Sequence, residues 1–342
     1  MAREERSYVR KRRRGGCLTG CLTRIVLLLG VMALLLVGAC VLGFVKIDDE
    51  TGAPSLSMEG VGLDGVDLSG LAQVDLSGVS LPKLGLSGVS MPGWAYGVEK
   101  QGLTVKTLRA GDGEAVLVCC DGYTMLLGGG ENGLMTAAQM LLCGVNRLSV
   151  AIAMGAQDGQ VGGMATAIRV GKPKYLIYPG TQTKTKKFNA MLSAAQGVEG
   201  LSLITPQQGL TFSLGRATVT IIGPAHTPHT DERDDGLSVR IDYGATSVLV
   251  MGTITARGEE DIVSSPANLD ANAIICALGG SDEATCARLV SKVSPSIALM
   301  TGKEPSGVVQ ARLEHAGAQV YTAQENGVMT LISDGADIRV EP

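Results

Sequence analysis

The chain has 342 residues, with 29 Lys and Arg against 33 Asp and Glu and a net charge of −4 at pH 7. That length is enough for one sizeable core with accessory segments. The charge is divided unevenly, because residues 1–24 carry a net +6 and the remainder carries −10. A remainder this acidic argues against a protein that binds nucleic acid through its overall charge.

The eight cysteines exclude two kinds of site. None belongs to a Cys-x-x-Cys pair, so neither a zinc knuckle nor a thioredoxin-like centre is predicted. An odd number lies in the C-terminal part of the chain, mostly within apolar stretches: Cys119, Cys120, Cys143, Cys276 and Cys286. We therefore expect buried free thiols there rather than a disulfide framework.

Residues 25–45 form a run of 21 residues without a charge. A helix of this length crosses a bilayer core of about 30 Å. The basic residues 1–24 precede it and are expected to stay in the cytoplasm, which places the chain beyond Lys46 outside the cell. We therefore expect a single-pass cell-membrane protein, anchored through residues 25–45, with an extracytoplasmic C-terminal domain.

The same segment also resembles a lipoprotein processing site. The sequence V-G-A-C at 37–40 has the small residues of such a site, with Cys40 as the lipidated residue. Apolar residues continue past Cys40, whereas a signal peptide has a shorter apolar region. The uncleaved anchor is therefore the favoured interpretation, and lipidation of Cys40 is the alternative.

Residues 46–93 are predicted to be a low-complexity spacer. They repeat a short Leu-Ser-Gly phrase at 67–70, 75–78 and 86–88, among further Gly, Ser and Pro residues. The repeats are too few and too irregular to stack as a stable solenoid. A flexible tether is therefore favoured over a small coil that binds a partner.

Residues 94–342 are predicted to form one α/β domain. Three apolar strands come first in a meander, at 103–108, 115–120 and 123–127. The later predicted elements are helix 133–143, strands 148–153 and 175–178, helix 185–196, strands 217–223, 237–243 and 247–251, helix 258–264, strand 273–277, helix 282–293, strand 297–300, helix 305–316, and strands near 320 and at 328–332. A meander followed by alternating strands and helices implies two sheets covered by helices, a four-layer αββα sandwich.

The loop at 154–163 has the sequence M-G-A-Q-D-G-Q-V-G-G and follows a predicted buried strand. In outline it resembles T-H-x-H-x-D-H-x-G-G, the loop of the metallo-β-lactamase fold that binds a pair of metal ions. The positions that match metal ligands carry Gly155, Gln157, Gly159 and Gln160, while Asp158 lies at a variable position. Glycine offers no side-chain ligand, and a neutral amide is a poor ligand for zinc.

Further motifs make the resemblance more specific. The sequence A-G-D-G-E-A at 110–115 and the segment at 235–244 resemble the metallo-β-lactamase-like domain of the ComEC-type competence (DNA internalisation) proteins. Three more matching motifs lack the Asp or His that the family has there. They carry Gly128 within L-L-G-G-G, Thr253 within M-G-T-I and Gly279 within L-G-G-S. The resemblance covers about 230 residues, from 103 to 333.

The resemblance implies descent from hydrolases that use metal ions to lower the pKa of a bound water. It also implies that this chemistry is lost, because all six placed ligand positions carry non-ligands: Gly155, Gln157, Gly159, Gln160, Thr253 and Gly279. We therefore expect a pseudoenzyme without a metal cofactor. Its expected role is to bind or scaffold an extracytoplasmic ligand or protein partner.

Two alternative functions stay open. His226, His229 and Asp231 form the one metal-like cluster of the sequence, which is compatible with a divergent hydrolase or nuclease that uses relocated zinc or manganese. A lysine-rich stretch is compatible with a DNA-uptake accessory that binds nucleic acid: Lys172, Lys174, Lys184, Lys186 and Lys187. Ordinary solvent exposure is the favoured interpretation of both groups.

Overall fold

The structure is a computed structural model that describes residues 45–47, 54–56, 102–111, 113–180 and 185–341. The chain divides into two units, Met1–Gly85 and Leu86–Pro342. In the first unit, β1 (Val45–Ile47) pairs antiparallel with β2 (Pro54–Leu56). The proposed membrane anchor lies outside the described residues except for Val45, as does nearly all of the proposed spacer. Among the described residues, no helix is long and apolar enough to cross a membrane.

The second unit contains two mixed β-sheets. The strands of the eight-stranded sheet are, in spatial order, β17 (Ile338–Glu341), β16 (Thr330–Ser333), β3 (Leu103–Thr107), β4 (Val116–Cys120), β5 (Tyr123–Leu127), β6 (Val150–Ile152), β7 (Tyr175–Ile177) and β8 (Ser202–Ile204). Pairing is antiparallel from β17 to β5 and parallel from β5 to β8. The change occurs where the chain passes from the meander to strands connected by helices.

The seven-stranded sheet has the same mixed character. Its strands are, in spatial order, β15 (Gln319–Thr322), β14 (Ile297–Met300), β13 (Ala273–Ile275), β12 (Thr246–Val250), β11 (Ser238–Tyr243), β10 (Ala217–Gly223) and β9 (Thr211–Leu214). Strands β9 to β12 pair antiparallel, and β12 to β15 pair parallel. Both β6 and β12 pair parallel with a neighbouring strand, and a loop follows the carboxyl end of each.

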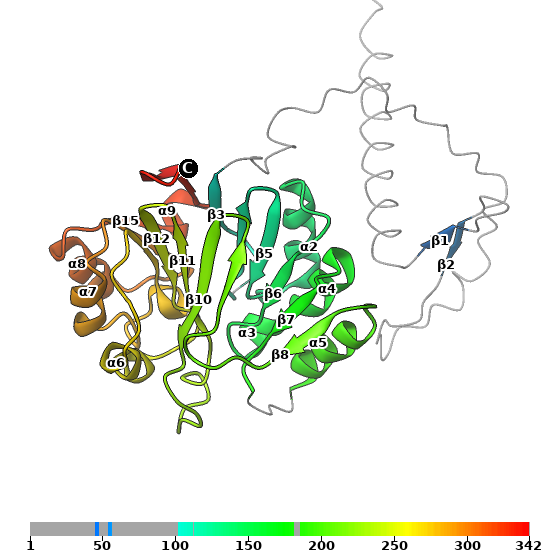
Figure 1. The fold of residues 1–342 in the computed structure, drawn as a ribbon, viewed down its shortest axis with the longest axis horizontal. Helices are drawn as coiled ribbons and strands as arrows, with labels where there is room; N and C mark the ends of the chain where they lie inside the picture. Colours follow the sequence, from blue (N-terminus) through cyan, green and yellow to red (C-terminus); the bar gives the residue numbers. More distant parts are fainter. Residues whose placement is uncertain (1–44, 48–53, 57–101, 112, 181–184, 342) are drawn as a thin grey trace, which may run out of the picture. The chain divides into compact units, whose positions relative to one another are not determined.

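Helices cover the outer faces of both sheets (Figure 1). The eight-stranded sheet is covered by α2 (Gly133–Leu142), α4 (Met164–Gly171) and α5 (Lys186–Gln196), and the seven-stranded sheet by α6 (Ala256–Ser264), α7 (Ala287–Val293) and α8 (Gly307–His315). Three shorter elements lie in the loops: α3 (Asp158–Val161), η2 (Ala277–Gly280) and α9 (Ala323–Asn326). The predicted four-layer αββα arrangement is confirmed.

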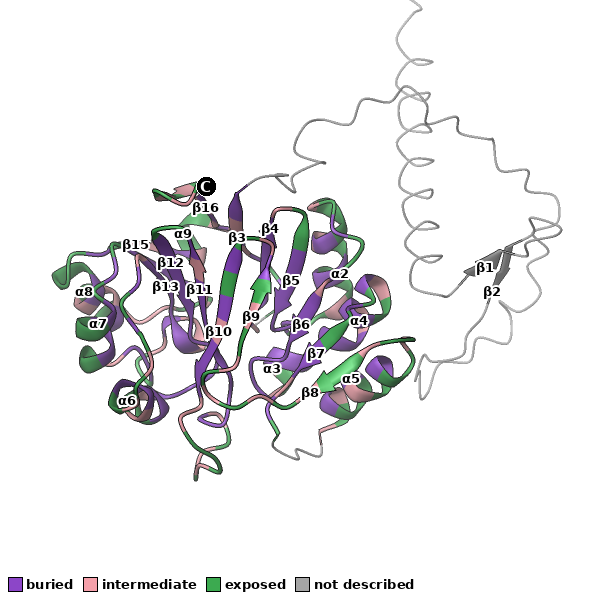
Figure 2. Cartoon of the chain, viewed as in Figure 1, coloured by how far each residue is buried: buried purple, intermediate pink, exposed green. Residues whose placement is uncertain are grey.

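Three layers of buried side chains hold the sandwich together. Val118, Ile152, Val239 and Val250 belong to the layer between the two sheets. A second layer joins α2, α4 and α5 to one sheet, and a third joins α6, α7 and α8 to the other. Figure 2 shows the result, with buried strands in the interior and helices exposed on their outer sides. Burial of this apolar area from water is the main force that favours the fold.

The elements that sequence periodicity missed are short and carry weak patterns. The residues of β8 are exposed or half exposed, and β9 and β17 each have only four residues, so none of these strands shows a clear alternation of buried and exposed residues. Helix α4 is absent from the predicted elements and follows the glycine-rich loop at 154–163. The predicted helix at 282–293 begins later, at Ala287, because η2 and a turn occupy the preceding residues.

All five cysteines in the described residues are free thiols. Cys119, Cys120 and Cys276 are buried, and Cys143 and Cys286 are partly buried. Desolvation by burial is the main cause that raises the pKa of Cys119 and of Cys276 to about 12. The prediction of buried thiols without a disulfide framework is confirmed for this part of the chain.

Candidate functional site

Three loops interlock at the end of β6. Backbone N–H groups of Gly129, Gly130 and Gly163 donate to the carbonyls of Gln160, Glu114 and Gly130, at 2.6, 2.9 and 2.9 Å. These bonds join the loop that precedes β4, the loop after β5 and the loop after β6. Two of these bonds hold the predicted motif at 154–163 against the loop after β5.

Three of the candidate positions lie close together: Gly155, Gln157 and Thr253. A Cβ built on Gly155 would lie 2.4 Å from Gln157 Oε1 and 2.7 Å from Thr253 Oγ1. Gly155 and Gln157 follow β6 in one sheet, whereas Thr253 follows β12 in the other. Thr253 Oγ1 also donates to the carbonyl of Arg233 at 3.3 Å. Positions about a hundred residues apart in the sequence thus converge, as the resemblance implied.

The remaining candidate positions have neighbours other than Gly155, Gln157 and Thr253. A Cβ on Gly128 would lie 2.9 Å from Gln160 Oε1, so these two positions are neighbours. Gly159 lies against Gly113, and Gly279 lies against the backbone of Gly302. Gly279 has a φ of 65°, a left-handed conformation that favours glycine. Asp158, at the variable position of the motif, is exposed at the start of α3.

A two-metal centre does not fit the side chains at these positions. The groups available are a threonine hydroxyl and two amides, while zinc is bound by imidazole, thiolate or carboxylate. Gln157 Oε1 and Gln160 Oε1 are buried without a hydrogen-bond partner among the described residues. They are free to accept hydrogen bonds, yet as neutral oxygens they cannot balance the charge of two divalent ions.

Glu114 is a functional candidate that the sequence did not single out. Its side chain is buried, and neither carboxyl oxygen has a hydrogen-bond partner among the described residues. Desolvation by burial raises the pKa of Glu114 to about 8. The residue lines a pocket of about 500 Å³ together with Arg109, Thr301 and Gly302. Strongly shifted carboxyls beside pockets are frequent at functional sites.

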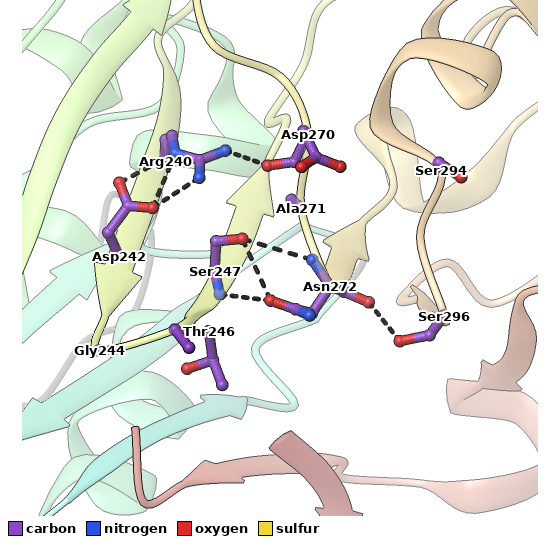
Figure 3. A pocket seen from close by; sticks show the side chains of 11 residues that line it. Arg240, Asp242, Gly244, Thr246, Ser247, Asp270, Ala271, Asn272, Ser294 and Ser296 are labelled. Atoms are coloured by element: carbon purple, nitrogen blue, oxygen red, sulfur yellow. Dashed lines mark hydrogen bonds and ion pairs between the residues drawn. The ribbon is translucent and has the colours of Figure 1, made fainter. Parts of the chain in front are cut away.

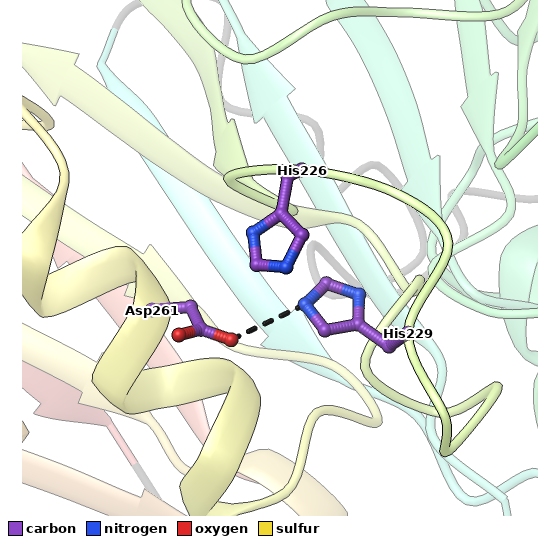
Figure 4. A group of neighbouring side chains, drawn as sticks. All are labelled: His226, His229 and Asp261. Atoms are coloured by element: carbon purple, nitrogen blue, oxygen red, sulfur yellow. Dashed lines mark ion pairs between the residues drawn. The ribbon is translucent and has the colours of Figure 1, made fainter.

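A second candidate site lies on the loop after β10. His226 and His229 converge with Asp261 of α6, and their ligand atoms all lie within 4.8 Å of one another (Figure 4). The predicted third member was Asp231, which is wrong. Asp231 pairs with Arg233 at 2.7 Å, and this hydrogen bond is the main cause that lowers its pKa. The expected absence of a metal cofactor therefore has no support at this loop.

The lysine cluster does not form one patch. Lys172 and Lys174 line a pocket of about 900 Å³ with Arg147 and Arg169. The other two described lysines begin α5, whose last turn borders the same pocket: Lys186 and Lys187. A helix of 11 residues is about 16 Å long, so the two pairs lie well apart. Lys184 lies outside the described residues.

A polar pocket of about 340 Å³ lies beside β11 and β12 (Figure 3). Arg240 donates to Asp242 at 2.6 Å and to the carbonyl of Asp270. Ser247 donates its N–H to Asn272 Oδ1 at 2.8 Å. Because these groups already bond to one another, the pocket offers few free partners to a ligand.

No protein-family model and no curated protein matches the chain. Among solved structures, the chain is similar to the metallo-beta-lactamase fold protein YhfI from Bacillus subtilis, at 14% identity and a TM-score of 0.44, over 67% of this chain and 99% of that one. It is similar to Tm1679, a metal-dependent hydrolase of the beta-lactamase superfamily, at 9% identity and a TM-score of 0.45, over 66% and 98%. A diphosphatase from the PhnP family matches at 9% identity and a TM-score of 0.41, over 67% and 98%. The activities named here belong to those proteins.

Proposed function

We propose that residues 94–342 are a metallo-β-lactamase-like domain of the ComEC type that binds a ligand or partner and does not hydrolyse it. The observation that carries the proposal is the meeting of Gly155, Gln157 and Thr253. Loops from both sheets bring these positions together, as a two-metal centre requires. The atoms present are an amide oxygen and a hydroxyl, which hold no metal that activates water. On this proposal the loop backbone of the hydrolase site is retained, and its metal-binding side chains are lost.

Free hydrogen-bond acceptors support binding as the role of this region. Gln157 Oε1, Gln160 Oε1 and both carboxyl oxygens of Glu114 are buried without a partner among the described residues. Buried polar groups in folded proteins are nearly always hydrogen-bonded, often through ordered water. A ligand that brings N–H or O–H donors, directly or through water, would complete these bonds.

The proposal includes the membrane anchor. Residues 25–45 carry no charge and follow a segment with a net +6, which supports a single span with its N-terminus in the cytoplasm. The domain then lies outside the cell, and residues 46–93 serve as its tether. Its partner is an extracytoplasmic molecule on this proposal.

Two observations bear on the alternative functions. The predicted third ligand, Asp231, is paired with Arg233, although His226 and His229 converge with Asp261 instead. Lys172 and Lys174 lie beside the last turn of α5, whereas Lys186 and Lys187 begin that helix. We therefore propose neither a hydrolase or nuclease with the predicted ligand set nor one continuous nucleic-acid patch.

The test is a hydrolysis assay on the full-length protein in detergent, with bis(4-nitrophenyl) phosphate and nitrocefin as probes and zinc or manganese added. We expect the wild type, Gln157→Ala and Thr253→Ala to give the rate of the metal-containing buffer. Metal-dependent turnover by the wild type that either substitution lowers tenfold or more would overturn the proposal. A thermal unfolding curve for each variant verifies that it is folded.

A further inference from the structure

The side chain of His229 is held in one orientation by a buried carboxylate. Asp235 Oδ1 accepts the backbone N–H of His229 at 2.9 Å and lies 2.8 Å from Nδ1 of the same ring. The His229 and Asp235 side chains are only 6% and 2% exposed. Since a carboxylate oxygen only accepts hydrogen bonds, Nδ1 is the ring nitrogen that donates to Asp235. A histidine that binds a metal ion is usually oriented by a carboxylate in this way.

The other ring nitrogen of His229 lies beside the Asp261 carboxylate. Nε2 is 3.3 Å from Asp261 Oδ2, and it is a buried nitrogen without a hydrogen-bond partner among the described residues. With Nδ1 directed at Asp235, Nε2 is the ring nitrogen that remains to bind a metal ion.

His226 adds a third ligand on the open side. Its ring lies 4.3 Å from the ring of His229, measured between centroids. Figure 4 shows both rings turned toward Asp261, with the histidines on the loop and the carboxylate on α6. The three ligand atoms lie within 4.8 Å of one another, and His226 is exposed. The group thus has a buried side and a side open to solvent.

The spacing suits a small divalent ion. Tetrahedral zinc with bonds of about 2.0–2.1 Å separates neighbouring ligand atoms by about 3.3–3.4 Å. The separation between His229 Nε2 and Asp261 Oδ2 is 3.3 Å. Arg257 is a competing cation at this carboxylate, with Nε 3.9 Å from Oδ2, and its side chain is 78% exposed. A side chain so exposed is free to move into solvent when an ion binds.

We propose that His226, His229 and Asp261 bind one zinc ion, with Asp235 as the carboxylate that orients His229. Three protein ligands leave a fourth position for water. The ion would join the loop after β10 to α6. That loop also contacts the candidate site around Gly155, because the carbonyl of Arg233 accepts a hydrogen bond from Thr253. The inference goes beyond the proposed function, since none of these residues is among the six ligand positions that the resemblance identifies.

The test measures zinc binding by the full-length protein in detergent, without a polyhistidine tag, after chelator treatment. Zinc is titrated against a competing fluorescent chelator, and bound metal is counted by mass spectrometry. We expect one zinc per chain, with affinity at least tenfold lower in His226→Ala and Asp261→Asn. Asp235→Asn is expected to weaken binding by about 10–100-fold, the effect of losing such an outer carboxylate.

The control is His315→Ala, which removes the remaining histidine at the end of α8. This variant should bind zinc as the wild type does. Because His226 is exposed, His226→Ala leaves the packing of the loop intact and keeps the test valid if a His229 variant fails to fold. Cobalt in place of zinc should give visible absorption bands that disappear in His226→Ala. No stoichiometric zinc, or zinc that is unaffected by both His226→Ala and Asp261→Asn, overturns the proposal.

Failure here is distinguishable from failure of the proposed function. Loss of zinc at His226 leaves the hydrolysis result for Gln157→Ala and Thr253→Ala unchanged. Conversely, metal-dependent hydrolysis that requires Gln157 or Thr253 would refute the non-catalytic role without affecting zinc binding at His229.

Discussion

Gly113 lies so close to Gly159 that a Cβ built on Gly113 would be 1.6 Å from the Gly159 carbonyl oxygen. The Gly159 oxygen belongs to the backbone and a Cβ has a fixed position on its Cα, so no side-chain rotation relieves the overlap. The contact presses the loop that precedes β4 onto the loop at 154–163. It explains why glycine stands at 113, and it helps to fix the position of the candidate site.

Gly113→Ala should therefore destabilise the protein by about 2 kcal/mol or more, since overpacking against backbone forces the loops apart. For a domain of this size that lowers the Tm by roughly 4 °C or more. The matched control is Gly307→Ala, because nothing lies within 4 Å of a Cβ at this first position of α8. Alanine favours a helix over glycine, so the control should unfold at the same temperature or higher. Equal melting temperatures for the two variants would contradict the close contact.

A second prediction, on the pH dependence of stability, follows from the raised pKa of Glu114. Burial raises this pKa from 4.5 to about 8 in the folded state. Below pH 4.5 the carboxyl is protonated in both states and costs nothing. As the pH rises toward 8, only the unfolded state releases the proton, so stability is lost across this window. The shift corresponds to at most about 5 kcal/mol, counting about 1.4 kcal/mol per pH unit.

Glu114→Gln removes that pH dependence. The variant should unfold at higher urea concentration than the wild type at pH 8, and the difference should disappear near pH 4.5. Glu199→Gln makes the same chemical change at an exposed carboxylate and should unfold at the same urea concentration as the wild type at both pH values. Urea unfolding curves at four pH values measure the effect. Parallel pH profiles for wild type and Glu114→Gln would mean that Glu114 is hydrated in solution.

The fold was predictable because its central strands carry long apolar runs. Every residue of β4 and β12 is buried, and both strands were placed to within one residue. Strand β8 was missed because its residues are exposed or half exposed. Edge strands bury little, so their residues carry little pattern.

The candidate site was predictable only where local sequence defines it. The frame at 154–163 follows from one strand and its glycines, whereas the choice between Asp231 and Asp261 depends on tertiary packing. Asp231 has Arg233 two residues away, which engages its carboxylate. Asp261 comes from α6, and only the packing of that helix brings it to His229. No pattern along the chain records such a contact.

Membrane topology is a third prediction. The net +6 of residues 1–24 should hold the N-terminus in the cytoplasm and expose the domain outside. Protease added to intact cells should therefore remove the chain beyond Lys46 and leave a short membrane-bound fragment. An antibody against the C-terminus measures the loss on a blot. A domain that is protected until the membrane is permeabilised would contradict the orientation.

Restoring the ancestral ligands is the last prediction. Gly155→His, Gln157→His, Gly159→Asp, Gln160→His and Thr253→Asp are combined in one variant. The three heavy atoms nearest to a Cβ at Gly155 belong to the side chains of Gln157 and Thr253, both of which are replaced. At Gly159 a Cβ would meet only the Gly113 Cα, at an ordinary 3.6 Å. Gly279 is left unchanged, because its φ of 65° and a Gly302 backbone atom at 2.6 Å both oppose a side chain.

The variant is built on a His226→Ala, His229→Ala background, so that the zinc site proposed above does not contribute. The background protein should then bind no zinc or manganese, and the restored protein should bind at least one ion per chain. The reason is the convergence of Gly155, Gln157 and Thr253, which places imidazole and carboxylate groups at one point. Metal content by mass spectrometry and chelator-dependent stabilisation measure the gain. A restored protein that is folded, as judged by circular dichroism, and still binds no metal would mean that these positions do not form the ancestral centre.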